Sequence, residues 1–251
     1  MKKFFLFAAT LLLVVGATQA QSRFNNFQWS ITAGTMTAPQ AAFYDLNGQS
    51  IALSDSGTML PLSLGVRCER EVIASDLLAW GWSLGAGLSH TGWNATIPAS
   101  TPNVSNSGST PAEEWSLEIP LLGWWADAGA YGTMYLGSYF EFYGSLGFSA
   151  IHYWSYGGNA SSASRTDKDA CADEDDGLSS TLLGPYGLLG IKASFKNDFF
   201  ISLSARYTYG LNNATFDGLF NWDAGSYSTR VTAPFTSDFS LMLGVGIMIE
   251  D

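Results

Sequence analysis

The chain has 251 residues and a formal net charge of −11, and 14% of its residues are aromatic while only 13% are charged. Proteins that bind nucleic acid present basic patches, so this acidic chain is not expected to bind nucleic acid. The length suits one domain of ordinary size.

Residues 1–20 predict a secretory signal peptide that is cleaved after Ala20. Lys2 and Lys3 form a short positive segment, residues 4–16 are an apolar run, and small residues precede Gln21. A membrane anchor is the weaker alternative, because a spanning helix needs about 20 apolar residues. No cysteine stands at the cleavage point, so an acyl anchor is not expected. Since two of the 11 basic residues leave with the signal peptide, residues 21–251 keep 9 against 22 acids, a formal charge of −13.

The mature sequence, residues 21–251, is treated as one domain that contains no transmembrane helix. It has no apolar stretch of the roughly 18 residues that such a helix requires. An exported, aromatic-rich membrane protein without helices can satisfy its backbone in lipid only as a closed barrel. The expected fold is therefore all-β.

A period of two residues supports this fold. In residues 78–90, Leu84 and Leu88 belong to an oily face, while the alternate positions are Ala, Gly and Ser. Residues 199–209 and 239–249 alternate in the same way, as a strand with one lipid face and one lumen face must. Less regular segments bring the count to about eight strands: 27–36, 59–70, 114–125, 138–154 and 182–195. Pro61, Pro120 and Pro185 weaken three of these, because proline donates no ladder hydrogen bond.

Connector lengths predict the topology. Long connectors rich in small and polar residues alternate with short ones, and Lys196-Asn197-Asp198 is the tightest. The long connectors are residues 37–57, 92–113, 155–180 and 210–236. Outer-membrane barrels have short periplasmic turns and longer extracellular loops. The sequence therefore predicts an up-and-down antiparallel barrel with both termini in the periplasm.

Aromatic residues predict two girdles at the membrane interfaces. The outer girdle is expected to hold Trp93, Trp115, Trp154, Tyr207 and Phe239, and the inner one Phe27, Trp80, Trp124, Phe195 and Phe199. A secreted, soluble β-sandwich would also alternate. Its strands, however, usually have about 5 to 6 residues, and a tilted bilayer-spanning strand needs about 9 to 11, so the longer segments here favour the barrel.

The segments "YFEFYGSLGFSAIHYW", "FFISLSARYTYG" and "SDFSLMLGVGIMI", together with the signal peptide, resemble the small outer-membrane β-barrel proteins of Gram-negative bacteria, described as porin-family or OmpA-, OmpX- or OmpW-like. The resemblance implies an outer-membrane location, contact with lipid, and insertion by the barrel-insertion machinery. One departure is the ending Met248-Ile249-Glu250-Asp251, where the family usually has a terminal aromatic residue. We therefore expect either that insertion uses a variant signal or that the insertion machinery requires the terminal aromatic residue less strictly.

The alternation assigns six charged side chains to the lumen: Arg67, Glu69, Glu118, Glu141, Lys192 and Arg206. An eight-stranded barrel is only just wide enough for its own side chains, so buried charges there must pair. We expect an internal ion-pair network that plugs the barrel, and the alternative is a gated polar pathway. Glycines on the inward face are interpreted as leaving space for larger side chains in a narrow lumen: Gly65, Gly85, Gly87, Gly147, Gly244 and Gly246.

One long connector packs six acids into residues 167–176. Calcium takes several carboxylate oxygens, which makes Asp167, Asp169, Asp173 and Asp175 candidate ligands. The spacing fails the helix-loop-helix calcium pattern, whose glycine position would be Ala172. A solvated acidic loop is the preferred interpretation.

Neither a cofactor nor catalysis is expected. His90 and His152 fall on the oily face near the outer rim, and the residues two positions further are Gly92 and Trp154, so the serine of a lipid-modifying hydrolase is missing. Cys68 is expected low on a strand and Cys171 in a loop at the other end, beyond the roughly 7 Å that a disulfide allows between Cα atoms.

The sequence thus predicts a monomeric outer-membrane barrel with a structural or surface-interacting role and a lumen plugged by side chains. The first alternative is a passive channel for small, even apolar, solutes through the lumen or the lateral wall. The second is a secreted soluble β-sandwich that binds a ligand. No feature of the sequence indicates an extracellular partner.

Overall fold

The computed structural model describes residues 26–75, 77–105, 108, 110–137, 139–168, 170–172, 178–195 and 198–250. The predicted signal peptide lies outside these residues. Within the described ranges, no helix is long and apolar enough to cross a membrane.

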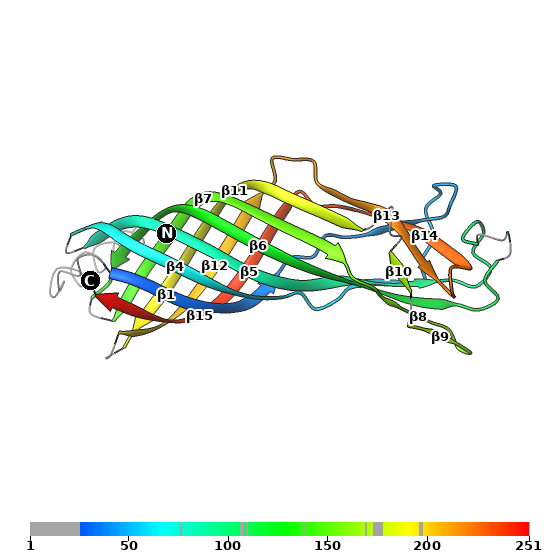
Figure 1. Cartoon of the computed structure of the whole chain (residues 1–251), viewed down its shortest axis with the longest axis horizontal. Coiled ribbons are helices and arrows are strands. Elements are labelled where there is room, and N and C mark those ends of the chain that lie inside the picture. The colour runs from blue at the N-terminus through cyan, green and yellow to red at the C-terminus, as the bar shows by residue number, and fades with distance from the viewer. Residues whose placement is uncertain are drawn as a thin grey trace, which may run out of the picture.

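Eight antiparallel strands close into a ring within the described residues (Figure 1). They are β1 (Asn26–Met36), β4 (Leu62–Ala74), β5 (Leu78–Ile97), β6 (Trp115–Tyr135), β7 (Phe140–Ser155), β11 (Ser179–Ser194), β12 (Phe199–Tyr209) and β15 (Ser237–Glu250). Each pairs with the next, and β15 returns to β1 with Asn26 opposite Glu250 and Met36 opposite Ser240. Ring closure confirms the predicted all-β barrel, and the soluble sandwich was the wrong alternative.

The connectors alternate as predicted. Short turns follow β4, β6 and β11 at the end of the ring where β1 begins and β15 ends (Figure 1). The four long connectors emerge at the opposite end, which is extracellular in an outer-membrane barrel.

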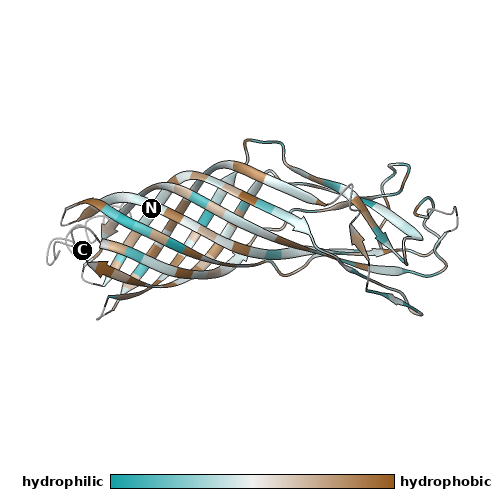
Figure 2. Ribbon diagram, viewed as in Figure 1, coloured by the Kyte–Doolittle hydropathy of each residue, from teal (hydrophilic) through white to brown (hydrophobic). Residues whose placement is uncertain are grey.

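The barrel wall is oily outside and polar inside. On β15, Leu243 is 61% exposed whereas Met242, its neighbour in sequence, is 2% exposed. Figure 2 shows this alternation as brown bands along the barrel strands. The apolar belt of outward side chains includes Ile31, Leu64, Val66, Leu84, Leu88, Leu146, Phe148, Leu189, Ile191, Leu203, Leu241, Leu243, Val245 and Ile247, all exposed. A continuous apolar surface of this extent around a closed barrel is typical of a wall that faces lipid hydrocarbon.

Above the belt, the long connectors fold into an extracellular cap rather than loose loops. The cap comprises the described parts of residues 37–61, 91–121, 156–178 and 210–236 (Figure 1). Its strands are β2 (Ala42–Tyr44), β3 (Asp55–Thr58), β8 (Asn159–Ser161), β9 (Thr166–Asp167), β10 (Cys171–Ala172), β13 (Thr215–Trp222) and β14 (Tyr227–Pro234). β3 pairs with the outer part of β5 and β8 with that of β6, while β10, β13, β14 and β2 form a second sheet.

The cap has a hydrophobic core. The rings of Trp93 and Phe216 meet edge to face with centroids 5.2 Å apart, and Phe235 lies 5.7 Å from Phe216. Other fully buried members come from several cap segments: Ile97, Leu117, Ile119, Phe220, Trp222 and Val231. Because water surrounds the cap, β5 and β6 turn their apolar side chains inward there, the reverse of their arrangement in the belt.

This reversal corrects several sequence-based assignments. Trp93 and Trp115 are not girdle residues, since they are 1% and 2% exposed in the cap core. β6 does not end at residue 125 but continues to Tyr135, so Trp124 lies at the outer end of the belt instead of the inner end. Cys68 and Cys171 are both free, as expected.

Candidate functional site

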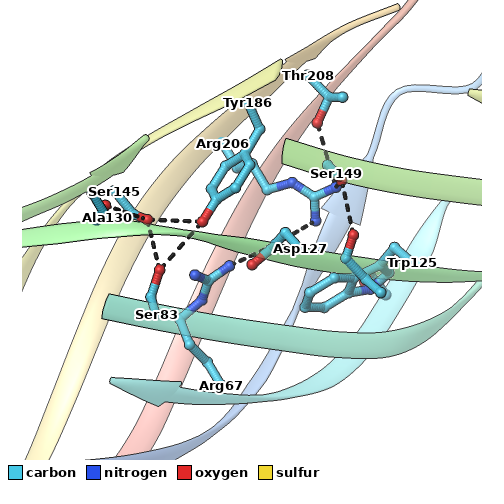
Figure 3. Close-up of polar contacts among 12 residues, drawn as sticks. Arg67, Ser83, Trp125, Asp127, Ala130, Ser145, Ser149, Tyr186, Arg206 and Thr208 are labelled. Carbon is cyan, nitrogen blue, oxygen red and sulfur yellow. Dashed lines mark hydrogen bonds and ion pairs between the residues drawn. The ribbon is translucent and has the colours of Figure 1, made fainter. Parts of the chain in front are cut away.

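Three buried charged side chains, Arg67, Asp127 and Arg206, meet inside the barrel and are called the cap-side cluster (Figure 3). Asp127 on β6 accepts a hydrogen bond from Arg67 Nη2 on β4 at 2.9 Å, and Arg206 Nη1 on β12 lies 3.4 Å from the same carboxylate oxygen. These residues are at most 5% exposed. Because β4, β6 and β12 are spread around the ring, the cluster bridges the cross-section of the lumen.

Aromatic rings pack around the cap-side cluster. The Arg206 guanidinium lies 4.9 Å from the centroid of the Trp125 ring, and its Nη2 donates to Ser149 Oγ at 2.9 Å. Trp125 Nε1 donates to Ser63 Oγ at 3.0 Å. The Trp125 ring lies over inward glycines, since a Cβ at Gly65 would sit only 2.4 Å from it. A Cβ at Gly85 or Gly87 would likewise lie within 3.0 Å of the Trp125 ring, so these three glycines make room for that ring.

A hydroxyl cluster lies beside these charges. Tyr186 Oη is 2.8 Å from Ser145 Oγ and 3.2 Å from Ser83 Oγ, and the two serine oxygens are 2.6 Å apart (Figure 3). These side chains come from β5, β7 and β11 and are all buried.

A second group, the turn-side cluster, is centred on Lys192 nearer the short turns. Its ammonium donates to Gln28 Oε1 at 2.6 Å, to Tyr131 Oη at 2.8 Å and to Glu69 Oε2. It also lies 4.3 Å from the centroid of the Tyr143 ring. Lys192 on β11 and Glu69 on β4 stand on opposite sides of the eight-stranded ring, so their ion pair spans its diameter.

Two further glutamates lie at the turn-side end of the lumen. Glu71 accepts a hydrogen bond from Tyr135 Oη at 2.7 Å, and Glu141 accepts one from Ser194 Oγ at 3.2 Å. Both are buried. A buried carboxylate is costly unless it is paired or hydrogen-bonded, and these hydrogen bonds offset part of that cost.

Of the six charged residues assigned to the lumen, the structure places Arg67, Glu69, Glu141, Lys192 and Arg206 inside it. The assignment of Glu118 to the lumen is wrong. It is exposed on the outer face of the cap, where its Oε2 accepts a hydrogen bond from Asn159 Nδ2 at 3.2 Å. The error arose because β6 reverses its oily face at that height, so Leu117 and Ile119 point inward instead.

Sequence reasoning missed the residue that joins the two arginines. Asp127 falls beyond residue 125, where the strand was expected to end. The alternation does continue there, with inward Asp127, Tyr131 and Tyr135. The outward residues, however, are mostly Ala and Gly, so the oily face is weak.

Comparison with solved structures matches this chain to outer-membrane proteins. OprG from Pseudomonas aeruginosa matches with a TM-score of 0.54 and 14% identity, over 91% of this chain and 98% of that one. A major outer membrane protein from Thermus thermophilus matches with a TM-score of 0.42 and 13% identity, over 89% and 99%. The outer membrane protease OmpT from Escherichia coli gives 0.39 and 9%, over 93% and 100%. Neither a family model nor a curated protein matches the sequence.

The chain folds as a small outer-membrane β-barrel. The identities are low, so this likeness concerns the fold and not the activity.

The outer-membrane barrel has aromatic residues at both rims of its belt. Trp80 is 58% exposed near the short turns, and Tyr207 is 48% exposed at the opposite rim. Trp124 and Trp154 flank His152 there, with ring centroids 5.9 and 5.6 Å from the His152 ring. His152 Nδ1 also lies 2.8 Å from Thr181 Oγ1. This arrangement suits an interfacial role.

The lipid-facing wall of the barrel carries an apolar groove of about 650 Å³. Its floor includes Gly132 and Gly144, which are paired across β6 and β7. Trp80, Phe142 and Leu146 form parts of its sides. Small residues on neighbouring strands thus leave a depression in the belt.

No group of three or more potential metal ligands occurs in the part of the chain that the structure describes. Of the calcium candidates, Asp167 accepts a hydrogen bond from the backbone of Ala224 at 3.2 Å. Asp169, Asp173 and Asp175 lie outside the described residues. The preference for a solvated acidic loop over a calcium site therefore stays a prediction.

Proposed function

We propose that this protein is a non-conducting outer-membrane barrel that presents its folded cap as a contact surface outside the cell. The observation that carries the proposal is the pair of charged clusters in the lumen. Arg67, Asp127 and Arg206 bridge three strands, and Lys192 reaches Glu69 across the ring. In a barrel only just wide enough for its own side chains, such clusters leave no room for a solute path.

The cap supports a surface role because it is a packed structure with its own core. Its aromatic core holds β13, β14 and the outer parts of β5 and β6 together. A rigid surface binds a partner at a lower entropic cost than mobile loops do. We propose no catalytic activity, and we propose that residues 1–20 direct export and are then removed, which N-terminal sequencing of the mature protein would test.

Planar-bilayer recording of the purified protein tests the blocked lumen. The wild type is expected to give no steady conductance. The double variant Glu69→Ala, Lys192→Ala removes the ion pair across the ring and is expected to conduct more often than the wild type. Steady ohmic current through wild-type protein would overturn the proposal.

Passive passage of small apolar solutes is a second candidate. The apolar interior of the cap and the wall groove of about 650 Å³ favour it, because a solute could pass laterally without crossing the charged clusters. Uptake of a fluorescent apolar solute by proteoliposomes separates the two functions. Uptake without ionic conductance would support the lateral route, and equal uptake by empty liposomes would rule it out.

A further inference from the structure

A polar pocket of about 370 Å³ opens on the outside of the wall where β5 and β6 leave the apolar belt. His90 follows the belt residue Leu88 on the outward face of β5. Pro120 on β6 has the corresponding place next to Leu122. Since Trp124 and Trp154 mark the outer rim of the belt, the pocket lies at the height of lipid headgroups.

The pocket presents one positive and one negative side chain. Lys168 and Glu118 both line it, together with His90, Tyr156 and Asn159. The neighbouring acid Asp167 accepts a hydrogen bond from the backbone of Ala224 and does not line the pocket. Among the described lining residues, the two opposite charges therefore balance.

Hydrogen bonds within the pocket hold Glu118 and the His90 and Tyr156 rings in place. Asn159 Nδ2 donates to Glu118 Oε2 at 3.2 Å, and His90 Nε2 lies 3.1 Å from Tyr156 Oη. Gly158 ties the pocket to the cap core, because a Cβ there would sit 2.6 Å from both the Glu118 carbonyl oxygen and the Phe220 ring. A pocket held by the cap in this way is formed before a ligand arrives, which favours binding.

We propose that the pocket binds a zwitterionic lipid headgroup of the phosphoethanolamine type, an inference that rests on the proposed outer-membrane location. Lys168 pairs with the phosphate, and Glu118 accepts hydrogen bonds from the primary ammonium. The apolar lining residues Met59 and Pro120 contact the glycerol and the upper chain. Glu118 repels a headgroup that is only anionic, and a choline headgroup offers it no N–H donor.

Native mass spectrometry of the full-length protein in detergent micelles, titrated with water-soluble dihexanoyl lipids, tests the proposal. The probes are dihexanoyl phosphatidylethanolamine, phosphatidylglycerol and phosphatidylcholine. One charge-assisted hydrogen bond is worth about a tenfold preference or more, so the ethanolamine lipid is expected to bind at least that much more tightly than the other two. Equal binding of all three lipids would overturn the proposal.

Two variants assign the preference to the two charges. Glu118→Gln is expected to bring the affinities for the ethanolamine and glycerol lipids together. Lys168→Ala is expected to weaken both, because both carry the phosphate. Glu114→Gln is the matched control, since this exposed carboxylate accepts a hydrogen bond from Ser54 outside the pocket. An unchanged preference in Glu118→Gln would contradict the assignment.

Phosphoethanolamine without chains separates a lipid from a free small molecule. It is expected to bind more weakly than the dihexanoyl lipid, and equal or tighter binding would overturn a lipid as the occupant. The heat-dependent gel mobility of each variant shows that the barrel is folded. Because the titration measures headgroup preference and not conductance, its outcome is independent of whether the lumen is blocked.

Discussion

β5 and β6 run through both the barrel and the cap, and their outer faces meet lipid in the barrel but water in the cap. Inside the belt, β5 and β6 turn Leu84 and Ala128 outward, and Ser83 and Asp127 inward. In the cap, the inward positions hold Trp93 and Ile119 instead. Each face therefore changes polarity near residues 90–92 on β5 and 120–122 on β6, while the alternation itself is unbroken.

This difference shows that strand periodicity and face polarity are separate pieces of information. Periodicity follows from the pleat and holds along the whole strand. Which face is apolar depends on whether hydrocarbon or water surrounds the strand at that height. The change in polarity thus locates the outer boundary of the membrane on the chain, and substitutions on each side of it can test this boundary.

The largest effect is expected when the polar interior of the barrel is broken. Asp127→Ala leaves the guanidinium groups of Arg67 and Arg206 without their shared carboxylate, and breaking a buried pair costs about 3–5 kcal/mol. Unfolding by guanidinium chloride in micelles, followed by tryptophan fluorescence, measures this loss. Asp127→Asn keeps the shape of the side chain and is expected to lose less. An unchanged midpoint for Asp127→Ala would mean that the cluster does not stabilise the barrel.

A comparable loss of stability, confined to the cap, is expected when the hydrophobic core of the cap is disrupted. Phe216→Ala removes a fully buried ring that contacts Trp93 and Phe235, and such truncations cost about 3–5 kcal/mol. Trypsin is then expected to cut the cap at Arg165 and Arg230, while the barrel keeps its heat-dependent mobility. Leu219→Ala on the half-buried outer face of β13 is the control. Loss of the barrel together with the cap would show that the two regions do not fold independently.

The sequence predicted the barrel well because its clearest strands lie wholly in the belt. β12 and β15 never leave the lipid, so their alternation of oily and polar residues is uninterrupted. The same signal misled at Glu118 and Trp115, where the prediction assumed that the oily face points to lipid throughout. Nothing local in residues 114–121 reveals that the strand has left the membrane.

The lumen could be predicted only in part, for a related reason. Arg67, Glu69, Lys192 and Arg206 alternate with large apolar residues, for example Leu64, Val66 and Ile191, so their inward direction could be inferred. Asp127 stands where the outward face is built from Ala and Gly, and the end of the strand was placed too early. The pairing of the charged residues depends on where their strands stand in the ring; β4 and β11, for example, lie opposite each other. The residue pattern of a single strand does not contain that information.

A smaller loss of stability is expected when an arginine is introduced on β5. The loss should differ between the two sides of the membrane boundary. Leu84→Arg puts a guanidinium in the lipid belt of β5, and an arginine near the bilayer midplane costs about 2–4 kcal/mol. Asn94→Arg places the same group on the outward face of β5 in the cap, where exposed substitutions usually change stability by less than about 0.5 kcal/mol. Unfolding midpoints in lipid vesicles measure both. Equal losses would mean that the membrane boundary does not lie between these residues.

The smallest effect is expected on the surface of the cap. Arg230 donates two hydrogen bonds of 2.6 Å to Asp217 and so lowers the pKa of that carboxyl below its ordinary value. A depressed pKa in the folded state means that the contribution to stability is present above the ordinary aspartate pKa of about 4 and is lost as the pH falls through the lower folded-state value. Both side chains are about half exposed, so Asp217→Asn is expected to lose at most about 1 kcal/mol at neutral pH.

Protease sensitivity of the cap, measured as a function of pH, checks this prediction. Trypsin is used near pH 7, and an acid-stable protease such as pepsin is used at the lowest pH values. Wild type and Asp217→Asn should differ slightly at neutral pH and converge below pH of about 4, because protonation of Asp217 removes the same ion pair that the substitution removes. The unfolding midpoint of the barrel should be the same in both proteins at every pH. A difference that persisted in acid would show that Asp217 stabilises the cap through its shape and not through its charge.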